Sequence, residues 1–108
     1  KYAMRSAMDI ATLGVSCLVK LSADKRTVED AALACGVAGP VPMRATSAEA
    51  AVRGLPVEQA VTAIGKAALE DVNPRTSWRA SKEFRLQLVE ELSGRALREA
   101  ARKGGAAV

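Results

Sequence analysis

The sequence predicts an α+β domain in which a small antiparallel sheet of about three strands is covered on one face by three helices. Two stretches, residues 9–21 and 28–37, alternate between apolar and polar side chains, whereas apolar residues recur every three or four positions beyond residue 47. The chain has 108 residues, which is enough for one hydrophobic core. We therefore expect a single domain over residues 1–103 and a flexible tail over residues 104–108.

The first strand is expected over residues 9–21, where the odd positions from Ala11 to Leu21 are apolar. This two-residue period is typical of a strand with one buried face. Residues 28–37 alternate in the same way and complete a hairpin, although their alanines also allow a helix. Residues 36–42 cannot be helical because they contain two prolines, so we expect a bend or a short edge strand there.

Three helices are expected after this bend. Residues 46–49 have the spacing of a capping box and predict a short helix over residues 47–54. Pro56 suits the first turn of a second helix, whose apolar stripe ends at residues 73–74. The last helix should run over residues 81–102, a length of about 33 Å, with a stripe formed by Phe84, Leu88, Val89, Leu92, Ala96, Leu97 and Ala100.

The composition excludes most catalytic chemistry. The chain contains no histidine, so it has no Ser-His or Cys-His pair, and its two cysteines cannot form a four-ligand zinc site alone. It also lacks the glycine-rich loops that bind nucleotide phosphates, and it has no apolar run of about 18 residues that could cross a membrane. We expect a soluble, cytoplasmic domain that has no catalytic residues and binds no metal or membrane.

The net charge of +4 comes entirely from the last third of the chain. Residues 75–108 carry eight basic and four acidic side chains, whereas the two signs balance over residues 1–74. The basic residues alternate with glutamates and are not accompanied by aromatic residues on which bases could stack. This pattern favours a solvated helix face, and no nucleic-acid partner is expected.

Arg85 differs from the other basic residues because helical spacing puts it on the apolar side of the last helix, beside Phe84 and Leu88. An unpaired guanidinium there would cost several kcal/mol, which predicts a partner carboxylate or several backbone carbonyls. Two interpretations stay open. Arg85 is either a structural buried arginine or a docking contact to a neighbouring domain.

Cys17 and Cys35 have the same parity as the apolar positions of the two predicted strands. A hairpin in which residue 21 lies opposite residue 31 would make the two cysteines neighbours. A disulfide is then conceivable, and the alternative is a pair of inert, buried thiols.

Three motifs together indicate a family. They are RSAMDIA at residues 5–11, GVAGPVPMR at residues 36–44 and WRASKEFR at residues 78–85. In this order and spacing they resemble the C-terminal domain of the FAD-binding (flavoprotein) subunit of molybdenum hydroxylases, a CO dehydrogenase flavoprotein C-terminal-like domain, and most of all that of bacterial xanthine dehydrogenases. The resemblance runs from residue 1 to about residue 101, with Phe84 where many relatives have tyrosine.

The resemblance implies a flavoprotein subunit in which two FAD-binding lobes precede this domain. Such a subunit takes electrons from 2Fe-2S clusters and passes them through FAD to NAD+ or another acceptor. The molybdenum cofactor and the 2Fe-2S clusters would lie on partner subunits. The resemblance also implies that this segment alone has no activity and binds no FAD, because the phosphate-binding loops belong to the upstream lobes.

Three residues at the start of the chain acquire expected roles through the resemblance. Lys1 corresponds to a family lysine at the flavin, where an ammonium group would stabilise negative charge on the reduced ring. Arg5 and Asp9 either dock against the FAD lobes or form a surface ion pair at the start of the first strand. The alternative function is an independent protein-interaction or dimerisation module.

Overall fold

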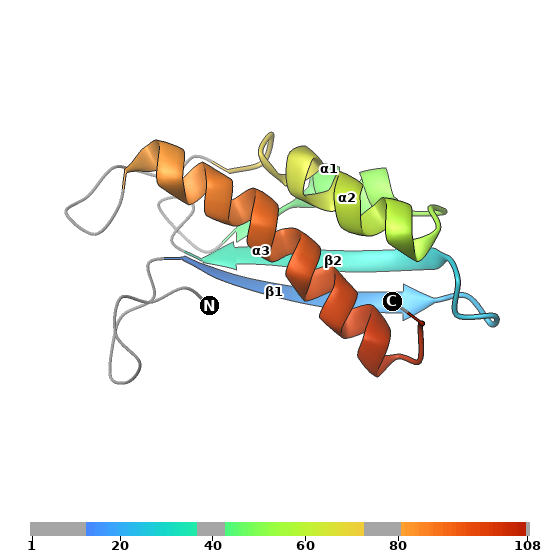
Figure 1. The fold of residues 1–108 in the computed structure, drawn as a ribbon. Helices are drawn as coiled ribbons and strands as arrows, with labels where there is room; N and C mark the ends of the chain where they lie inside the picture. Colours follow the sequence, from blue (N-terminus) through green and yellow to red (C-terminus); the bar gives the residue numbers. More distant parts are fainter. Residues whose placement is uncertain (1–12, 37–42, 73–80, 108) are drawn as a thin grey trace.

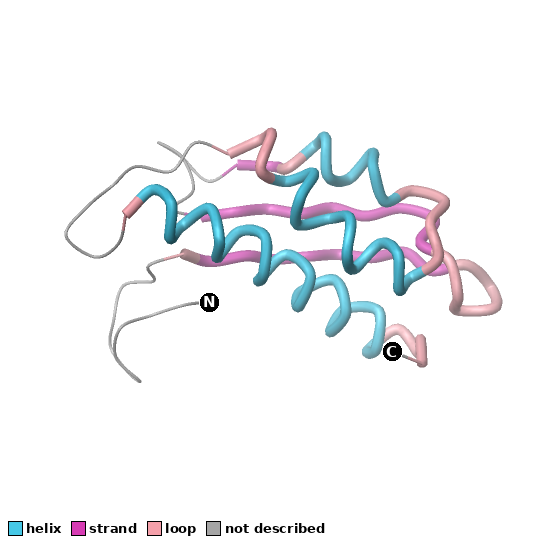
Figure 2. Tube along the Cα trace, turned by 45° about the horizontal axis from the view of Figure 1, so that its top comes forward, coloured by secondary structure: helices cyan, strands magenta, loops and turns pink. Residues whose placement is uncertain are grey.

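The computed structural model describes residues 13–36, 43–72 and 81–107, and in these ranges it has two layers (Figures 1 and 2). One layer is an antiparallel sheet with strand order β1-β2-β3, and the other consists of three helices on one face of that sheet. The predicted α+β fold is confirmed. The elements are β1 (Gly14–Leu21), β2 (Val28–Gly36), β3 (Met43–Arg44), α1 (Thr46–Val52), α2 (Val57–Ala68) and α3 (Lys82–Lys103).

The hairpin of β1 and β2 forms where the alternation predicted it, and the alanine-rich second segment is a strand. Its register differs by two residues from the expected one, because Val19 and not Leu21 lies opposite Ala31. The turn explains the difference. The Ser22 amide donates to the Thr27 carbonyl, which pairs Leu21 with Val28, and a bulge beside Lys20 restores regular pairing.

The shifted register separates the two cysteines. Cys17 lies opposite Leu33, Cys35 lies opposite Val15, and both thiols are free. Burial raises the pKa of each thiol to about 11, with a smaller effect of a nearby carboxylate. Both thiols are therefore protonated at neutral pH, as expected of the inert alternative.

The expected capping box at the start of α1 is wrong. Ala45 occupies the N-cap position without a side-chain hydrogen bond, and the side chain of Glu49 turns toward the sheet. Instead, Asp71 from the end of the α2 region accepts hydrogen bonds from the amides of Ser47 (2.9 Å) and Ala48 (3.3 Å). A carboxylate distant in the sequence thus supplies the acceptor that helix amides need.

The two longer helices begin close to their predicted positions. Pro56 precedes α2, which ends at Ala68, several residues before the expected stop. Ser81 caps α3 by accepting a hydrogen bond from the Phe84 amide at 3.1 Å. The 22 residues of α3 agree with the predicted length within one residue at each end.

The buried stripe of α3 is displaced by one residue from the predicted stripe. Phe84 is 37% exposed, whereas Arg85 is fully buried. The centre of the buried face follows a four-residue spacing and consists of Arg85, Val89, Ser93, Leu97 and Ala101. Leu88, Val89 and Leu97 are buried as predicted, but the rest of the predicted stripe is not, because polar or small residues occupy part of the contact with β1 and α2.

Two glycines bring α2 and α3 close together. A Cβ atom on Gly65 of α2 would collide with the backbone carbonyl of Glu90 in α3. A Cβ on Gly94 of α3 would lie 3.0 Å from the Val61 carbonyl oxygen in α2. Because neither glycine has a Cβ atom, the two backbones can touch, and the helices pack together above the sheet.

The core lies between the helices and the sheet. Its largest fully buried apolar side chains come from β2, all three helices and the residue before β1, and they include Leu13, Val28, Leu33, Val52, Ile64, Val89 and Leu97. Beyond α3, Ala106 is 6% exposed and its amide donates to the Ala101 carbonyl at 2.9 Å. Among the described residues, no helix is both long and apolar enough to cross a membrane.

Candidate functional site

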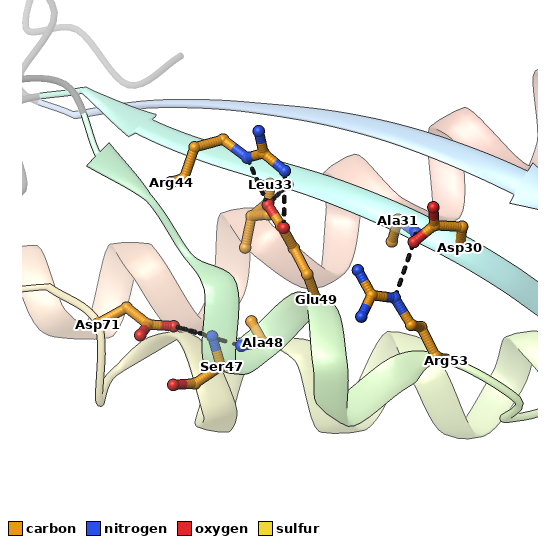
Figure 3. A network of polar contacts seen from close by, with 9 residues as sticks. All are labelled: Asp30, Ala31, Leu33, Arg44, Ser47, Ala48, Glu49, Arg53 and Asp71. Atoms are coloured by element: carbon orange, nitrogen blue, oxygen red, sulfur yellow. Dashed lines mark hydrogen bonds and ion pairs between the residues drawn. The ribbon is translucent and has the colours of Figure 1, made fainter.

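A network of polar contacts lines the outer edge of β2 (Figure 3). The short strand β3 pairs only with Ala34 and Cys35 of β2, and the chain then turns into α1. Beyond this point the Leu33 amide donates to Glu49 Oε2 at 2.9 Å, and the Leu33 carbonyl accepts from the Ala45 amide at 2.8 Å. The carboxylate of Glu49 therefore takes the place of a backbone acceptor from a third strand.

Arg44 holds Glu49 in this position with two hydrogen bonds. Its Nε donates to Oε2 at 2.7 Å and its Nη2 donates to Oε1 at 2.8 Å, while Glu49 is only 3% exposed. The hydrogen bonds from Arg44, together with the one from the Leu33 amide, lower the pKa of Glu49. The same pair raises the pKa of Arg44. Glu49 is therefore ionised at neutral pH and fully engaged.

Asp30 continues the network along the strand. Its Oδ1 accepts hydrogen bonds from the Ala31 amide at 2.9 Å and from Arg53 Nε at 2.8 Å. The hydrogen bond from Arg53 is the main reason why the pKa of Asp30 is lowered. Glu49 and Asp30 thus satisfy two successive outward amides of β2, which indicates a structural role for this network rather than a catalytic one.

Sequence reasoning missed the partners in this network. The sequence predicts Glu49 in a capping box and gives Arg44 only as the end of a motif. The pairing of Arg44 with Glu49 needs the chain to pass from strand to helix between them, and no spacing rule detects this. In the described ranges, no cluster of three or more His, Cys, Asp or Glu residues could hold a metal ion.

Of the predicted site residues, Lys1, Arg5 and Asp9 lie outside the described residues. Arg85 lies in the first turns of α3, is fully buried, and interacts with other parts of the chain. Its inward orientation agrees with the sequence. A role in docking to a neighbouring domain stays a prediction.

Several described residues that adjoin the three family motifs lie toward one end of the domain. Gly14 lies opposite Gly36, and Met43 lies opposite Cys35, so β1 begins, β2 ends and β3 begins at the same end of the sheet. The start of α3 lies at this end as well (Figure 1). The described residues that adjoin the motifs are thus close in space, although they are far apart in the sequence.

The basic residues of α3 are partly neutralised by glutamates on the same helix. Arg95 Nε lies 2.9 Å from Glu91 Oε1, and Arg102 lies 3.6 Å from Glu99. These pairs are exposed and contribute little stability, but they lower the local positive charge. They agree with the interpretation of α3 as a solvated face.

The sheet face opposite the helices is open. We call open face the surface formed by Ser16, Leu18, Lys20, Ala32, Ala34 and Arg44, which line two adjoining shallow hollows. Leu18 is 74% exposed. Arg44 of this surface binds Glu49, and Arg53 also lines one of the hollows, so the polar network lies along the edge of the open face.

Comparison with known proteins identifies the family. Residues 1–100 match the family model of the CO dehydrogenase flavoprotein C-terminal domain. The chain belongs to this family. The predicted resemblance is therefore confirmed.

Relatives are similar over nearly all of this chain but are much longer. The xanthine dehydrogenase FAD-binding subunit of Escherichia coli O157:H7 is 43% identical over 106 residues, and so is its counterpart in Escherichia coli strain K12. The alignment covers 97% of this chain and 36% of each relative. The chain therefore spans about a third of the length of these relatives.

Solved structures share the fold. Carbon monoxide dehydrogenase of Hydrogenophaga pseudoflava is similar with a TM-score of 0.82 at 26% identity, covering 94% of this chain and 36% of that one. Quinoline 2-oxidoreductase of Pseudomonas putida 86 is similar with a TM-score of 0.85 at 22% identity, covering 94% of this chain and 35% of that one. The arrangement of sheet and helices is thus kept in enzymes whose names differ.

Proposed function

We propose that this chain is the C-terminal domain of the FAD-binding subunit of a xanthine dehydrogenase-like molybdenum hydroxylase. In the complete enzyme, the subunit would carry electrons from 2Fe-2S clusters through FAD to NAD+ or another acceptor. The molybdenum-cofactor and 2Fe-2S subunits would be its partners. The family membership, with 43% identity to subunits that are named for this role, supports the proposal.

The described residues fit a domain that supports FAD binding without holding the cofactor itself. In these ranges, no run of glycines precedes a helix, so they offer no loop for the diphosphate of FAD. The chemistry that FAD would supply is the storage of electrons received from iron-sulfur clusters. This chain would contribute Lys1, whose ammonium group would favour negative charge on the reduced ring.

The observation that carries the proposal is the gathering of the residues that adjoin the motifs at one end of the domain. A surface that recognises FAD lobes needs residues from several segments on the same side. Arg5 and Asp9, which lie outside the described residues, would dock against the FAD lobes. Arg85, buried near the start of α3, would support this end from inside the domain.

The proposal is tested on the complete subunit. Wild-type subunit purified from its full-length gene should contain bound FAD, visible in its absorption spectrum. Lys1→Ala should reduce the FAD content or lower the reduction potential of the flavin, since it removes the positive charge. Lys25→Ala, in the exposed turn between β1 and β2, serves as a charge-matched control and should change neither quantity.

Two results would contradict the proposal in different ways. An unchanged FAD content and potential in Lys1→Ala would remove the role of Lys1 alone. A gene that starts near Lys1 and encodes no FAD lobes would reject the subunit assignment and favour an independent interaction module.

A further inference from the structure

We infer that the open face of the sheet packs against the FAD-binding part of the same polypeptide, an inference that rests on the proposed function. The occupant is therefore a tethered segment of the subunit and not a second copy or a partner subunit.

The centre of the open face is apolar. Leu18 is 74% exposed, and Phe84 is the other large apolar side chain that is exposed in the described ranges. Ala32 lies directly opposite Leu18, and Ala34 lies opposite Ser16. Burying a leucine side chain is favourable by about 1.5–3 kcal/mol, so this strip is stabilised when another surface covers it.

The charges around the open face are already paired within the domain. Arg44 binds Glu49, Arg53 binds Asp30, and Lys20 lies 3.7 Å from Glu29. A strongly charged partner would have to compete with these pairs. The border therefore favours a partner surface with few charges, as in the core of a permanent interface.

The area of the face favours a tethered occupant. β1 is eight residues long, about 26 Å, and β3 has only two residues, so most of the face is two strands or about 10 Å wide, which corresponds to a planar area of about 250 Å². Stable association of separate chains buries about 800 Å² on each partner. A covalently linked segment needs less area because its effective concentration is in the millimolar range. The relatives, of which the aligned region is 36%, contain enough additional chain to supply it.

The test measures the accessibility of Leu18 in the complete, FAD-bound subunit. A Leu18→Cys variant is treated with a maleimide near pH 7.5, and the modified residue is identified by tandem mass spectrometry. The native Cys17 and Cys35 react slowly because burial raises the pKa of both thiols to about 11. Labelling is expected to be at least tenfold slower than in the same subunit unfolded in urea.

Gln59→Cys is the matched control, since Gln59 is exposed on α2 in the helical layer. Its labelling rate in the folded subunit should stay close to the unfolded rate. Equally fast labelling of Leu18→Cys in the folded subunit would overturn the inference. So would protection that appears only after partner subunits are added, or protection that disappears on dilution.

The outcome can be separated from that of the proposed function. A subunit that binds FAD but leaves Leu18→Cys reactive rejects only the docking of the open face. A full-length product without FAD lobes rejects the proposed function, whatever the labelling rate.

Discussion

Glu49 accepts a hydrogen bond from one outward amide of β2. A longer third strand would accept hydrogen bonds from several such amides. Its carboxylate accepts the Leu33 amide of β2 while Arg44 holds it from the other side. Because the side chain is buried, removing it leaves a backbone donor without an acceptor in a place that water reaches poorly.

Glu49→Ala is expected to lower the free energy of unfolding by about 2–3 kcal/mol, because both the Leu33 amide and Arg44 lose their partner. Glu49→Gln keeps an acceptor but loses the charge, so its loss should be about half as large. Urea denaturation measures both. Glu90→Ala, which removes an exposed carboxylate from α3, should change stability by less than about 0.5 kcal/mol. Equal effects of Glu49→Ala and Glu90→Ala would contradict the role of Glu49.

The titrating residues also predict how stability depends on pH. The pKa values of Glu49 and Asp30 are lowered in the folded state, so their stabilisation is complete above the unfolded values near 4 and is lost as pH falls. The pKa values of Cys17 and Cys35 are raised, so their contribution is present below about pH 8.5 and is lost as pH rises.

The chain has no histidine, so we expect nearly constant stability between about pH 5 and 8. Urea denaturation across the pH range should find this plateau, with a fall on the acid side that is shallower in Glu49→Gln than in the wild type. A steep change between pH 6 and 7 would contradict the assignment.

Among the elements, α2 and α3 depend on their contact at Gly65 and Gly94. The predicted apolar stripe of α3 lies one residue away from the buried face. The prediction rests on large apolar side chains, whereas part of the real contact is a close approach of two backbones. A pattern of hydrophobicity cannot locate a glycine contact, since the partner backbone comes from a different helix.

Gly65→Ala should destabilise the fold by about 2–3 kcal/mol, because the added Cβ meets the rigid carbonyl of Glu90. This loss exceeds the helix-propensity gain of about 1 kcal/mol that alanine brings. Gly94→Ala, with a looser contact to Val61, should cost less. Thermal and urea unfolding of the two variants would show the order, and an unchanged or higher stability of Gly65→Ala would contradict the close contact.

Local signals predicted the elements that depend on neighbouring residues. The alternation of β1 and the length of α3 follow from short stretches of sequence. The register of the hairpin was wrong by two residues because it depends on the hydrogen bonds of the turn at Ser22 and Asp24. The start of α1 was misassigned because Asp71, which supplies the acceptor, is more than twenty residues away.

At the scale of the whole molecule, the order of strands and helices predicts the fold better than the identities of individual side chains do. The same fold occurs in carbon monoxide dehydrogenase at 26% identity, so its arrangement tolerates replacement of most residues. Motif resemblance identified the family, but it could not reveal the open face. That surface exists only after β1 and β2 pair and the helices cover the opposite side.

The carboxylates along β2 have a consequence for aggregation. Sheets grow into fibrils by adding strands to an edge whose amides are free. Glu49 and Asp30 occupy two successive amides of β2, so a foreign strand cannot join there while both are ionised. Protonation of both carboxylates at acid pH would weaken these hydrogen bonds. The two amides of β2 would then be available to pair with a strand from another molecule.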